Sequence, residues 1–290
     1  TGKLVLGGQQ GVEDCMIVTK GGRIGVSLQD DGTFLAPADG VMSHRQFLSA
    51  GLLTDEQNRR QRVLTEVLAG ERQADFPDRP HLFFWTKSWD TGIDFGKRLR
   101  PIGSTLVAVP LKLARPAAGT EVVIPAPLIS FRSVGGPDGT AAGGMYDNRQ
   151  RQWLERSRPS LVWLEFQVPD VLLPLESTAA RIAFEVHGPV QQLAVAAFHD
   201  GNAVPLATWN SPVGTLTANL TERQHLALSP GGTLLLRVTA GGPVTEDFDP
   251  TVTAQGRASY WRIESLRLEL RGRVLADNEP SLSTSSPPSP

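Results

Sequence analysis

Cysteine pairs and long apolar runs are what this sequence lacks. Cys15 is the single cysteine among 290 residues, so no internal disulfide can form and the redox compartment cannot be read from cysteine usage. A free cysteine in an apolar stretch behaves as a small buried hydrophobe, which is the role we expect for Cys15. A chain of this length buries roughly 75% of its unfolded surface, so it needs no disulfide or metal to hold a core.

Motifs of the common catalytic and metal sites are also missing. No two of the five histidines lie within four residues of each other, and no HxH, HExxH or CxxC occurs. No GxSxG elbow is present, and no GxGxxG or GxxxxGK[ST] loop follows a strand. We therefore predict no catalytic residue, no cofactor and no metal. The one alternative is a structural calcium on Glu246, Asp247 and Asp249, although that loop lacks EF-hand spacing and a glycine at the turn.

Charge and hydropathy exclude two further classes. Lysine and arginine number 28 against 30 acidic residues, a net charge of −2, so there is no basic stripe to neutralise nucleic-acid phosphates. The densest basic cluster, residues 58–62, falls on a predicted helix and is typical of a solvated helix face. No segment approaches the ~18 apolar residues of a membrane-spanning helix. We predict no nucleic acid as partner, and a membrane only through a segment outside this chain.

The first 79 residues predict a short β segment followed by one helix. Residues 1–44 read as short strands, with a hairpin at Gly21-Gly22, and would be the end of a truncated β domain. Within 45–79, a helix and a linker, Thr54 and Gln57 form a capping box that opens a helix over 54–69. The helix carries an apolar stripe that should lie against a sheet, made of Val63, Leu64, Val67 and Leu68.

Residues 80–275 read almost entirely as strand and turn. In 161–168 apolar residues alternate with Trp163, Glu165 and Gln167, the pattern of a strand with one wet face. Runs of strands without interleaved helices favour one jelly-roll-like two-sheet β-sandwich, with two smaller sandwiches divided at 135–158 as the alternative. The tail 276–290 is rich in serine and proline and should be disordered.

The segment 260–274 contains a change of parity. Leu266, Leu268 and Leu270 share one parity, whereas Trp261 and Ile263 have the other. One extra residue near 264–265 would put both sets in the core, which is what a β-bulge does. The charged row that alternates with the leucines would then face water, although an anion or a partner could also bind it.

Two loops gather aromatic rings beside carboxylate and amide groups. Rings of this kind can cover the apolar face of a sugar while the polar groups bind its hydroxyls, but they can equally close one end of a sandwich core. If they form one patch, the two loops must meet. The candidate ligand-binding residues are Trp89, Asp90, Tyr146, Asp147, Asn148 and Trp153.

Residues 1–70 carry a resemblance. The stretch 4–28, followed by the helix 52–68, is similar to the C-terminal all-β extracytoplasmic region of large membrane-anchored bacterial proteins without assigned activity, and residues 145–153 share it more weakly. The resemblance implies an extracytoplasmic location and an anchor upstream, and it brings no catalytic residues. We therefore predict a non-catalytic interaction or structural region of a larger anchored protein, with a protein partner. The alternative is a carbohydrate-binding β-sandwich module, alone or attached to a hydrolase, with a glycan as ligand.

Overall fold

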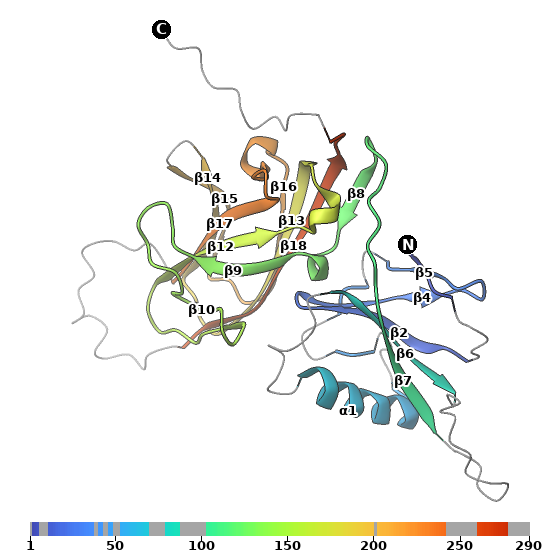
Figure 1. The fold of residues 1–290 in the computed structure, drawn as a ribbon. Coiled ribbons are helices and arrows are strands. Elements are labelled where there is room, and N and C mark those ends of the chain that lie inside the picture. Colours follow the sequence, from blue (N-terminus) through green and yellow to red (C-terminus); the bar gives the residue numbers. More distant parts are fainter. Residues whose placement is uncertain are drawn as a thin grey trace, which may run out of the picture. The chain divides into compact units, whose positions relative to one another are not determined.

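The computed structural model of the chain describes residues 2–5, 11–37, 40–42, 46–48, 53–69, 79–87, 103–199, 202–241 and 260–277. Antiparallel strands dominate these residues, and α1 (Asp55–Ala69) is the one α-helix among them. The chain divides into two compact units, residues 1–113 and 114–290 (Figure 1). The prediction of a mostly β protein with a jelly-roll-like two-sheet sandwich and one helix is confirmed.

The first unit consists of α1 and two antiparallel sheets. One sheet has four strands in the order β3-β2-β6-β7, and the other has three in the order β1-β5-β4. The predicted hairpin is present, because Thr19 pairs with Gly22, whose positive φ of 139° suits a glycine. The strands are β1 (Gly2–Lys3), β2 (Glu13–Thr19), β3 (Gly22–Gly25), β4 (Ser27–Leu28), β5 (Thr33–Leu35), β6 (His81–Lys87) and β7 (Ser104–Pro110).

Both faces of the four-stranded sheet are covered. On one face Leu64 and Leu68 of α1 pack with Met16, Phe83 and Trp85 of the sheet, as the predicted helix-on-sheet packing requires. The other face forms a second apolar cluster, in which β5 contributes one ring; its buried members are Ile17, Ile24, Phe34, Leu82 and Phe84.

The predicted start of the sandwich at residue 80 is corrected by these pairings. Strands β6 and β7 pair with each other, and β6 also pairs with β2, so both belong to the first unit. The physical reason lies in β6, where residues 82–86 are five consecutive buried positions. A strand buried on both faces reads as a continuous apolar run, whereas a sandwich strand with one wet face alternates.

The helix begins as predicted but buries a different stripe. The backbone N–H of Gln57 donates to Thr54 Oγ1 at 3.2 Å, and the N–H of Thr54 donates to Gln57 Oε1 at 3.1 Å, so the capping box is formed. Leu64 and Leu68 are buried, but Val63 and Val67 are 42% and 56% exposed. The prediction of a four-residue apolar stripe was therefore half wrong.

Arg60 occupies the place on the buried stripe that an apolar residue would otherwise take. It lies four residues before Leu64 and is 7% exposed. Its guanidinium donates to Asp14 at 2.6 Å and to Glu13 at 2.8 Å, and it lies 5.5 Å from the centre of the Trp85 ring. Burial alone would lower the pKa of Arg60, but the hydrogen bonds that it donates to these two carboxylates raise it. A paired arginine thus fastens the helix to β2.

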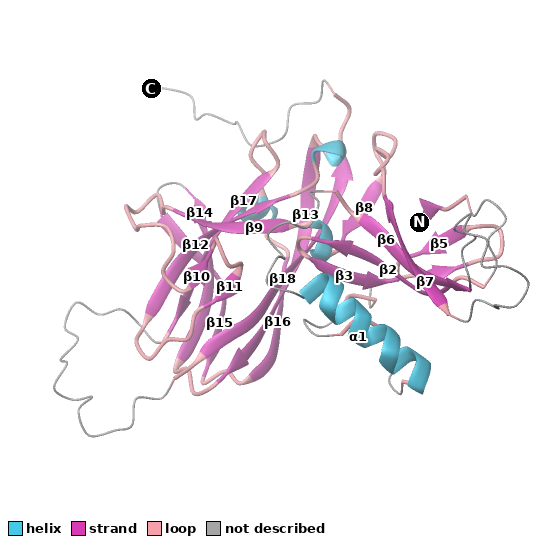
Figure 2. Cartoon of the chain, turned by 60° about the horizontal axis from the view of Figure 1, so that its bottom comes forward, coloured by secondary structure: helices cyan, strands magenta, loops and turns pink. Residues whose placement is uncertain are grey.

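The second unit is a two-sheet β-sandwich (Figure 2). One sheet has the strand order β15-β14-β17-β12-β9, the other has the order β16-β13-β18-β8, and neighbouring strands in both sheets are antiparallel. A two-stranded ribbon, β10-β11, is added. The strands are β8 (Glu121–Ile124), β9 (Ser130–Val134), β10 (Tyr146–Asp147), β11 (Gln152–Trp153), β12 (Ser160–Gln167), β13 (Leu175–His187), β14 (Gln192–His199), β15 (Asn202–Asn210), β16 (Gly214–Leu220), β17 (Thr233–Ala240) and β18 (Arg262–Val274).

One continuous core lies between the two sheets. Leu164 and Leu236 of the five-stranded sheet and Ile182 and Leu268 of the four-stranded sheet belong to the same buried cluster. Strand β9, which precedes the long loop 135–145, pairs with β12, which follows it. A division into two smaller sandwiches at this loop is therefore wrong, because the loop leaves one sheet and returns to it.

The predicted bulge is present in β18. Glu185 pairs with Ser265 and the next residue, Val186, pairs with Ile263, so Glu264 is the extra residue. As a result Trp261 and Ile263 lie in the same core cluster as the three leucines 266, 268 and 270. The alternate positions, 267, 269, 271 and 273, face away from the core. The last of them, Arg273, pairs with Glu176 at 3.0 Å.

Two features of the described segments bear on the membrane and on the tail. None of their helices has the length and apolar character that crossing a membrane requires. Of the tail expected to be disordered, 276–290, the structure describes only residues 276 and 277.

Candidate functional site

Four of the six predicted ligand residues lie on a small hairpin of the second unit, and three of them, Tyr146, Asp147 and Asn148, line one pocket. Strands β10 and β11 pair antiparallel, with Tyr146 opposite Trp153 and Asp147 opposite Gln152. The hairpin lies in the long connection between β9 and β12 (Figure 1). Trp89 and Asp90 lie outside the described residues, and so do the calcium candidates Glu246, Asp247 and Asp249.

Asp147 builds the turn of this hairpin. Its Oδ1 accepts hydrogen bonds from the backbone N–H groups of Arg149 at 2.7 Å and Gln150 at 3.0 Å. Arg151 closes the turn with a positive φ of 52°. Local carboxylate-to-backbone bonds of this kind are why aspartate favours turns. The second carboxylate oxygen, Oδ2, makes no hydrogen bond within the described part of the chain.

Asn148 fastens the hairpin to the edge of the sandwich. Its Oδ1 accepts from the backbone N–H of Ser133 at 2.7 Å, and its Nδ2 donates to the carbonyl of the same residue at 2.8 Å. The amide thus imitates the backbone of a neighbouring strand at β9. The hydroxyl of Ser133 accepts in turn from the N–H of Gly143 at 3.1 Å. Ser133 was missed by the sequence reasoning, because nothing local distinguishes it from other strand serines.

The aromatic residues of the hairpin belong to the core rather than to an exposed platform. Tyr146 is 6% exposed, and its ring lies 5.0 Å from that of Phe131 and 5.1 Å, edge-on, from that of Trp153. Phe131 in turn lies 5.4 Å from Phe166. Trp153 is half-buried and packs against the sandwich core. The rings therefore close the core, as the alternative interpretation of these loops expected.

An open pocket of about 330 Å³ lies beside the hairpin. Tyr146, Asp147 and Asn148 line it, whereas Trp153 does not. The remaining lining residues are Ser133, Ala142, Gly143, Gly144 and Leu154. Because the glycines have no side chains, backbone N–H and C=O groups border the pocket. Three of its residues are among the predicted ligand residues, whereas Ser133 comes from strand β9 and the two glycines from the loop that follows it.

Burial changes the chemistry of one group in the pocket. Removal from water raises the pKa of Tyr146 to about 12, an effect that the nearby Arg151 opposes and Asp147 supports. The phenol is therefore a neutral hydrogen-bond donor at physiological pH. Its hydroxyl makes no hydrogen bond to any residue the structure describes, so it is available to a ligand. A phenol and a carboxylate on one hollow can bind hydroxyl groups.

No metal centre or nucleophile accompanies this pocket. Across the described ranges, no group of three or more His, Cys, Asp or Glu side chains is arranged to hold a metal ion. Cys15 is half-buried in the first unit, and burial raises the pKa of its thiol to about 11, so it is protonated at neutral pH. The polar groups that line the pocket are those of Ser133, Tyr146, Asp147 and Asn148.

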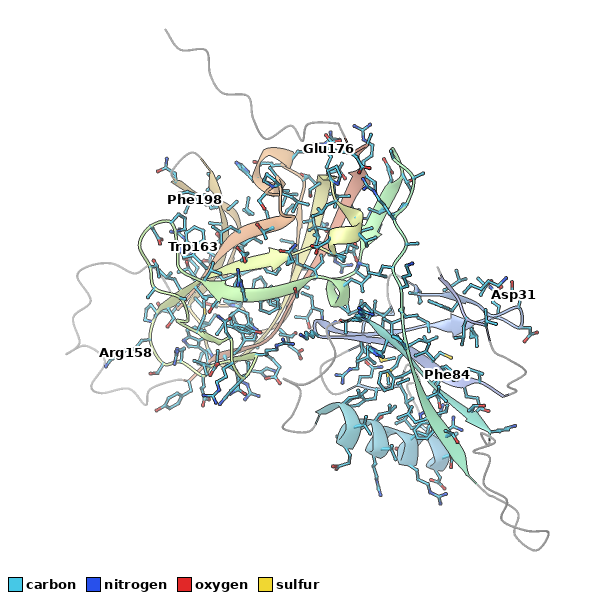
Figure 3. All side chains as sticks on the ribbon, in the orientation of Figure 1. Asp31, Phe84, Arg158, Trp163, Glu176 and Phe198 are labelled. Carbon is cyan, nitrogen blue, oxygen red and sulfur yellow. The ribbon has the colours of Figure 1, made fainter. Side chains whose placement is uncertain are left out.

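A second aromatic cluster lies on the outer face of the five-stranded sheet. Trp163 occupies a position predicted to be wet, yet it is 1% exposed. Its indole N–H donates to Asp138 at 3.0 Å, its ring meets Phe198 edge-on at 5.8 Å, and the Arg237 guanidinium lies 5.8 Å from its centre (Figure 3). Residues of the glycine-rich loop close over it, since an added Cβ on Gly136 would lie 2.1 Å from the indole nitrogen.

Comparisons with known proteins find similar chains only among solved structures. No family model and no curated protein matches the chain. Among solved structures, a low-affinity xylan-binding module of family 86 from Roseburia intestinalis is 10% identical, with 53% of this chain and 97% of that chain covered and a TM-score of 0.27. A family 61 carbohydrate-binding module in complex with β-1,4-galactotriose is 14% identical, with 51% and 86% covered and a TM-score of 0.23.

A third solved structure, a family 29 carbohydrate-binding module, is 9% identical, with 52% of this chain and 89% of that chain covered and a TM-score of 0.24. At such identities and TM-scores the likeness assigns no ligand and no binding residue to this chain. A ligand has to be argued from the pocket itself.

Proposed function

We propose that the second unit is a non-catalytic module that binds a carbohydrate in the pocket beside the β10–β11 hairpin. The observation that supports this is the convergence of Ser133, Tyr146, Asp147 and Asn148 on one open hollow. These four side chains come from two segments that meet through the bidentate bond between Asn148 and Ser133. The pocket is therefore held in shape before a ligand arrives, which lowers the entropic cost of binding.

Each polar group keeps hydrogen-bonding capacity for a sugar hydroxyl. An amide side chain offers two donors and two acceptor lone pairs, and Asn148 uses one of each. The Oδ2 of Asp147 has lone pairs free, and the hydroxyls of Tyr146 and Ser133 can each donate. Since the Tyr146 ring is almost fully buried, it offers its hydroxyl rather than a stacking face.

The lining favours binding over hydrolysis. Most glycoside hydrolases use a pair of carboxyl groups about 5–9.5 Å apart on either side of the scissile bond. Among the residues that line this pocket, Asp147 alone carries a carboxylate, and one of its oxygens is engaged in the turn. An open pocket without a stacking ring also predicts weak binding, with a Kd on the order of 0.1–1 mM, equivalent to about −5 to −4 kcal/mol.

Isothermal titration of the full chain against a panel of oligosaccharides tests this proposal. Tyr146→Phe removes one hydroxyl and should weaken binding about 2- to 10-fold, the effect of one neutral hydrogen bond. The matched control is Tyr260→Phe, since Tyr260 is 61% exposed and does not line the pocket. The proposal is wrong if no oligosaccharide binds at millimolar concentration. It is also wrong if both variants bind the oligosaccharide as tightly as the parent chain does.

A second proposal concerns the context of the chain. The resemblance of residues 1–70 supports an extracytoplasmic interaction region of a larger membrane-anchored protein. The first unit is compact by itself, with its own two apolar clusters, which suits such a region. Fractionation of cells that express the full-length protein, with protease added outside, would test it. Cleavage of the chain only after the cytoplasmic membrane has been broken would contradict an extracytoplasmic position.

A further inference from the structure

Arginines concentrate in the segment of the β10–β11 hairpin, in a chain that is otherwise slightly acidic. Within residues 146–158, four arginines stand against the two carboxylates Asp147 and Glu155, a local excess of two positive charges. The chain as a whole carries −2. The arginines are Arg149, Arg151, Arg156 and Arg158.

Three of these side chains are not used by the fold. Arg149, Arg151 and Arg158 are exposed, and none of their guanidinium groups forms an ion pair within the segments that the structure describes. Figure 3 shows Arg158 at the outer edge of the second unit. Some arginines on the sheets are paired instead, since Arg132 pairs with Glu165 at 2.6 Å. Arg273 likewise pairs with Glu176.

None of the four arginines lines the pocket, but Arg156 contacts one of its lining residues. The guanidinium of Arg156 donates to the carbonyl of Gly144, a lining residue. The backbone of Arg156 is fixed as well, because it exchanges two hydrogen bonds with Trp261, at 2.8 and 2.9 Å. Arg151 ends the turn of the β10–β11 hairpin, on which the lining residues 146–148 also lie. The segment that carries the polar side chains of the pocket is therefore rich in arginine.

From this arrangement we infer that the pocket selects an acidic glycan, with arginines of the β10–β11 hairpin binding the carboxylate of a uronic acid. The inference rests on the proposed carbohydrate binding and specifies its ligand class. A guanidinium presents a planar fork of donors that matches a carboxylate through two parallel hydrogen bonds. A neutral sugar can accept hydrogen bonds from a guanidinium, but it lacks the charge that would pair with it. The sugar hydroxyls would then face the phenol of Tyr146 and the carboxylate of Asp147.

Matched ligands separate the charge of the sugar from its skeleton. The full chain is titrated with tri-galacturonic acid and with its fully methyl-esterified form, which keeps the skeleton and loses the charge. We expect the acid to bind at least 10-fold more tightly at 20 mM salt. The preference should shrink towards equality at 500 mM salt, because exposed charges are screened within a few ångströms there.

Matched variants locate the charge. Arg151→Gln removes an exposed, unpaired guanidinium and should reduce the preference for the acid at least 3-fold, and adding Arg149→Gln should reduce it further. Arg132→Gln is the control, because Arg132 is exposed but already paired with Glu165. Circular dichroism confirms that each variant is folded. If Arg132→Gln has the same effect as Arg151→Gln, the charge acts from a distance and the assignment to the hairpin is wrong.

The outcomes distinguish this inference from the function on which it rests. If the ester and the acid bind equally, the acidic ligand is overturned while carbohydrate binding stands. If neither binds at millimolar concentration, both proposals fail. Tri-glutamate provides a peptide of the same charge, and binding as tight as that of tri-galacturonic acid would show recognition of an acidic protein segment instead, which also overturns the inference.

Discussion

Removal of Trp261 tests the bulge in β18, on which the core of the second unit depends. Trp261 is 4% exposed and belongs to the core cluster only because Glu264 shifts the register of the strand. An aromatic side chain buries about 150–250 Å², and at about 25 cal/mol per Å² this corresponds to about 4–6 kcal/mol. Substitutions of buried Phe or Trp by Ala cost about 3–5 kcal/mol. We expect Trp261→Ala to lower the free energy of unfolding by that amount.

Hydrogen exchange provides an assay specific to the second unit. The slowest amides of β13 and β18 report its opening free energy without a contribution from the first unit. The neighbouring variant Tyr260→Ala serves as control, because Tyr260 is 61% exposed and its loss should change the free energy by less than about 0.5 kcal/mol. Equal, small effects of both variants would mean that the strand runs without a bulge and exposes Trp261. Deletion of Glu264 should be worse than either, since it moves Trp261 and Ile263 to the outer face.

Three further predictions concern other elements. Thr54→Ala should destabilise the chain by about 1 kcal/mol, because α1 loses its capping hydroxyl, and an unshifted urea midpoint would contradict this. Gly136→Ala should cost about 1–3 kcal/mol through the contact with Trp163, whereas Gly135→Ala, whose added Cβ meets nothing closer than 3.6 Å, should be nearly neutral in thermal melts. In a Tyr260→Phe background the tyrosinate absorbance should appear near pH 12 in the folded chain and near pH 10 in urea. Because the folded pKa of Tyr146 is the higher one, its burial stabilises the fold fully below pH 10, and this stability is lost as the pH rises to 12; coincident titrations would contradict the burial.

Local patterns in the sequence correctly predicted several elements. The capping box of Thr54 and Gln57, the hairpin at Gly22 and the bulge at Glu264 all depend on residues within a few positions of one another. Strand alternation in 161–168 correctly placed Leu164 and Phe166 in the core. Such features are predictable because backbone geometry and side-chain parity are set by the segment itself.

Contacts between distant segments decided the rest. Strand β6 could be assigned to the first unit only by its pairing with β2, more than 60 positions earlier in the chain. Arg60 is buried because Asp14, 46 positions away, neutralises it. Trp163 is covered because Asp138, 25 positions away, accepts its N–H. Each of these outcomes runs against the local pattern, since polarity alone places an arginine outside and alternation alone places Trp163 in water.

The candidate site shows the same division. Composition alone drew attention to Tyr146, Asp147, Asn148 and Trp153, and three of them line one pocket. The fold decided which of their atoms remain without a hydrogen bond or contact. Asn148 pairs with Ser133, 15 positions away, and the ring of Trp153 packs edge-on against that of Tyr146. A hydrogen-bonding group in a sequence has an unknown partner until the chain is folded. The sequence by itself determined the chemistry that is present, and the tertiary structure determined which groups the fold uses and which it leaves for a ligand.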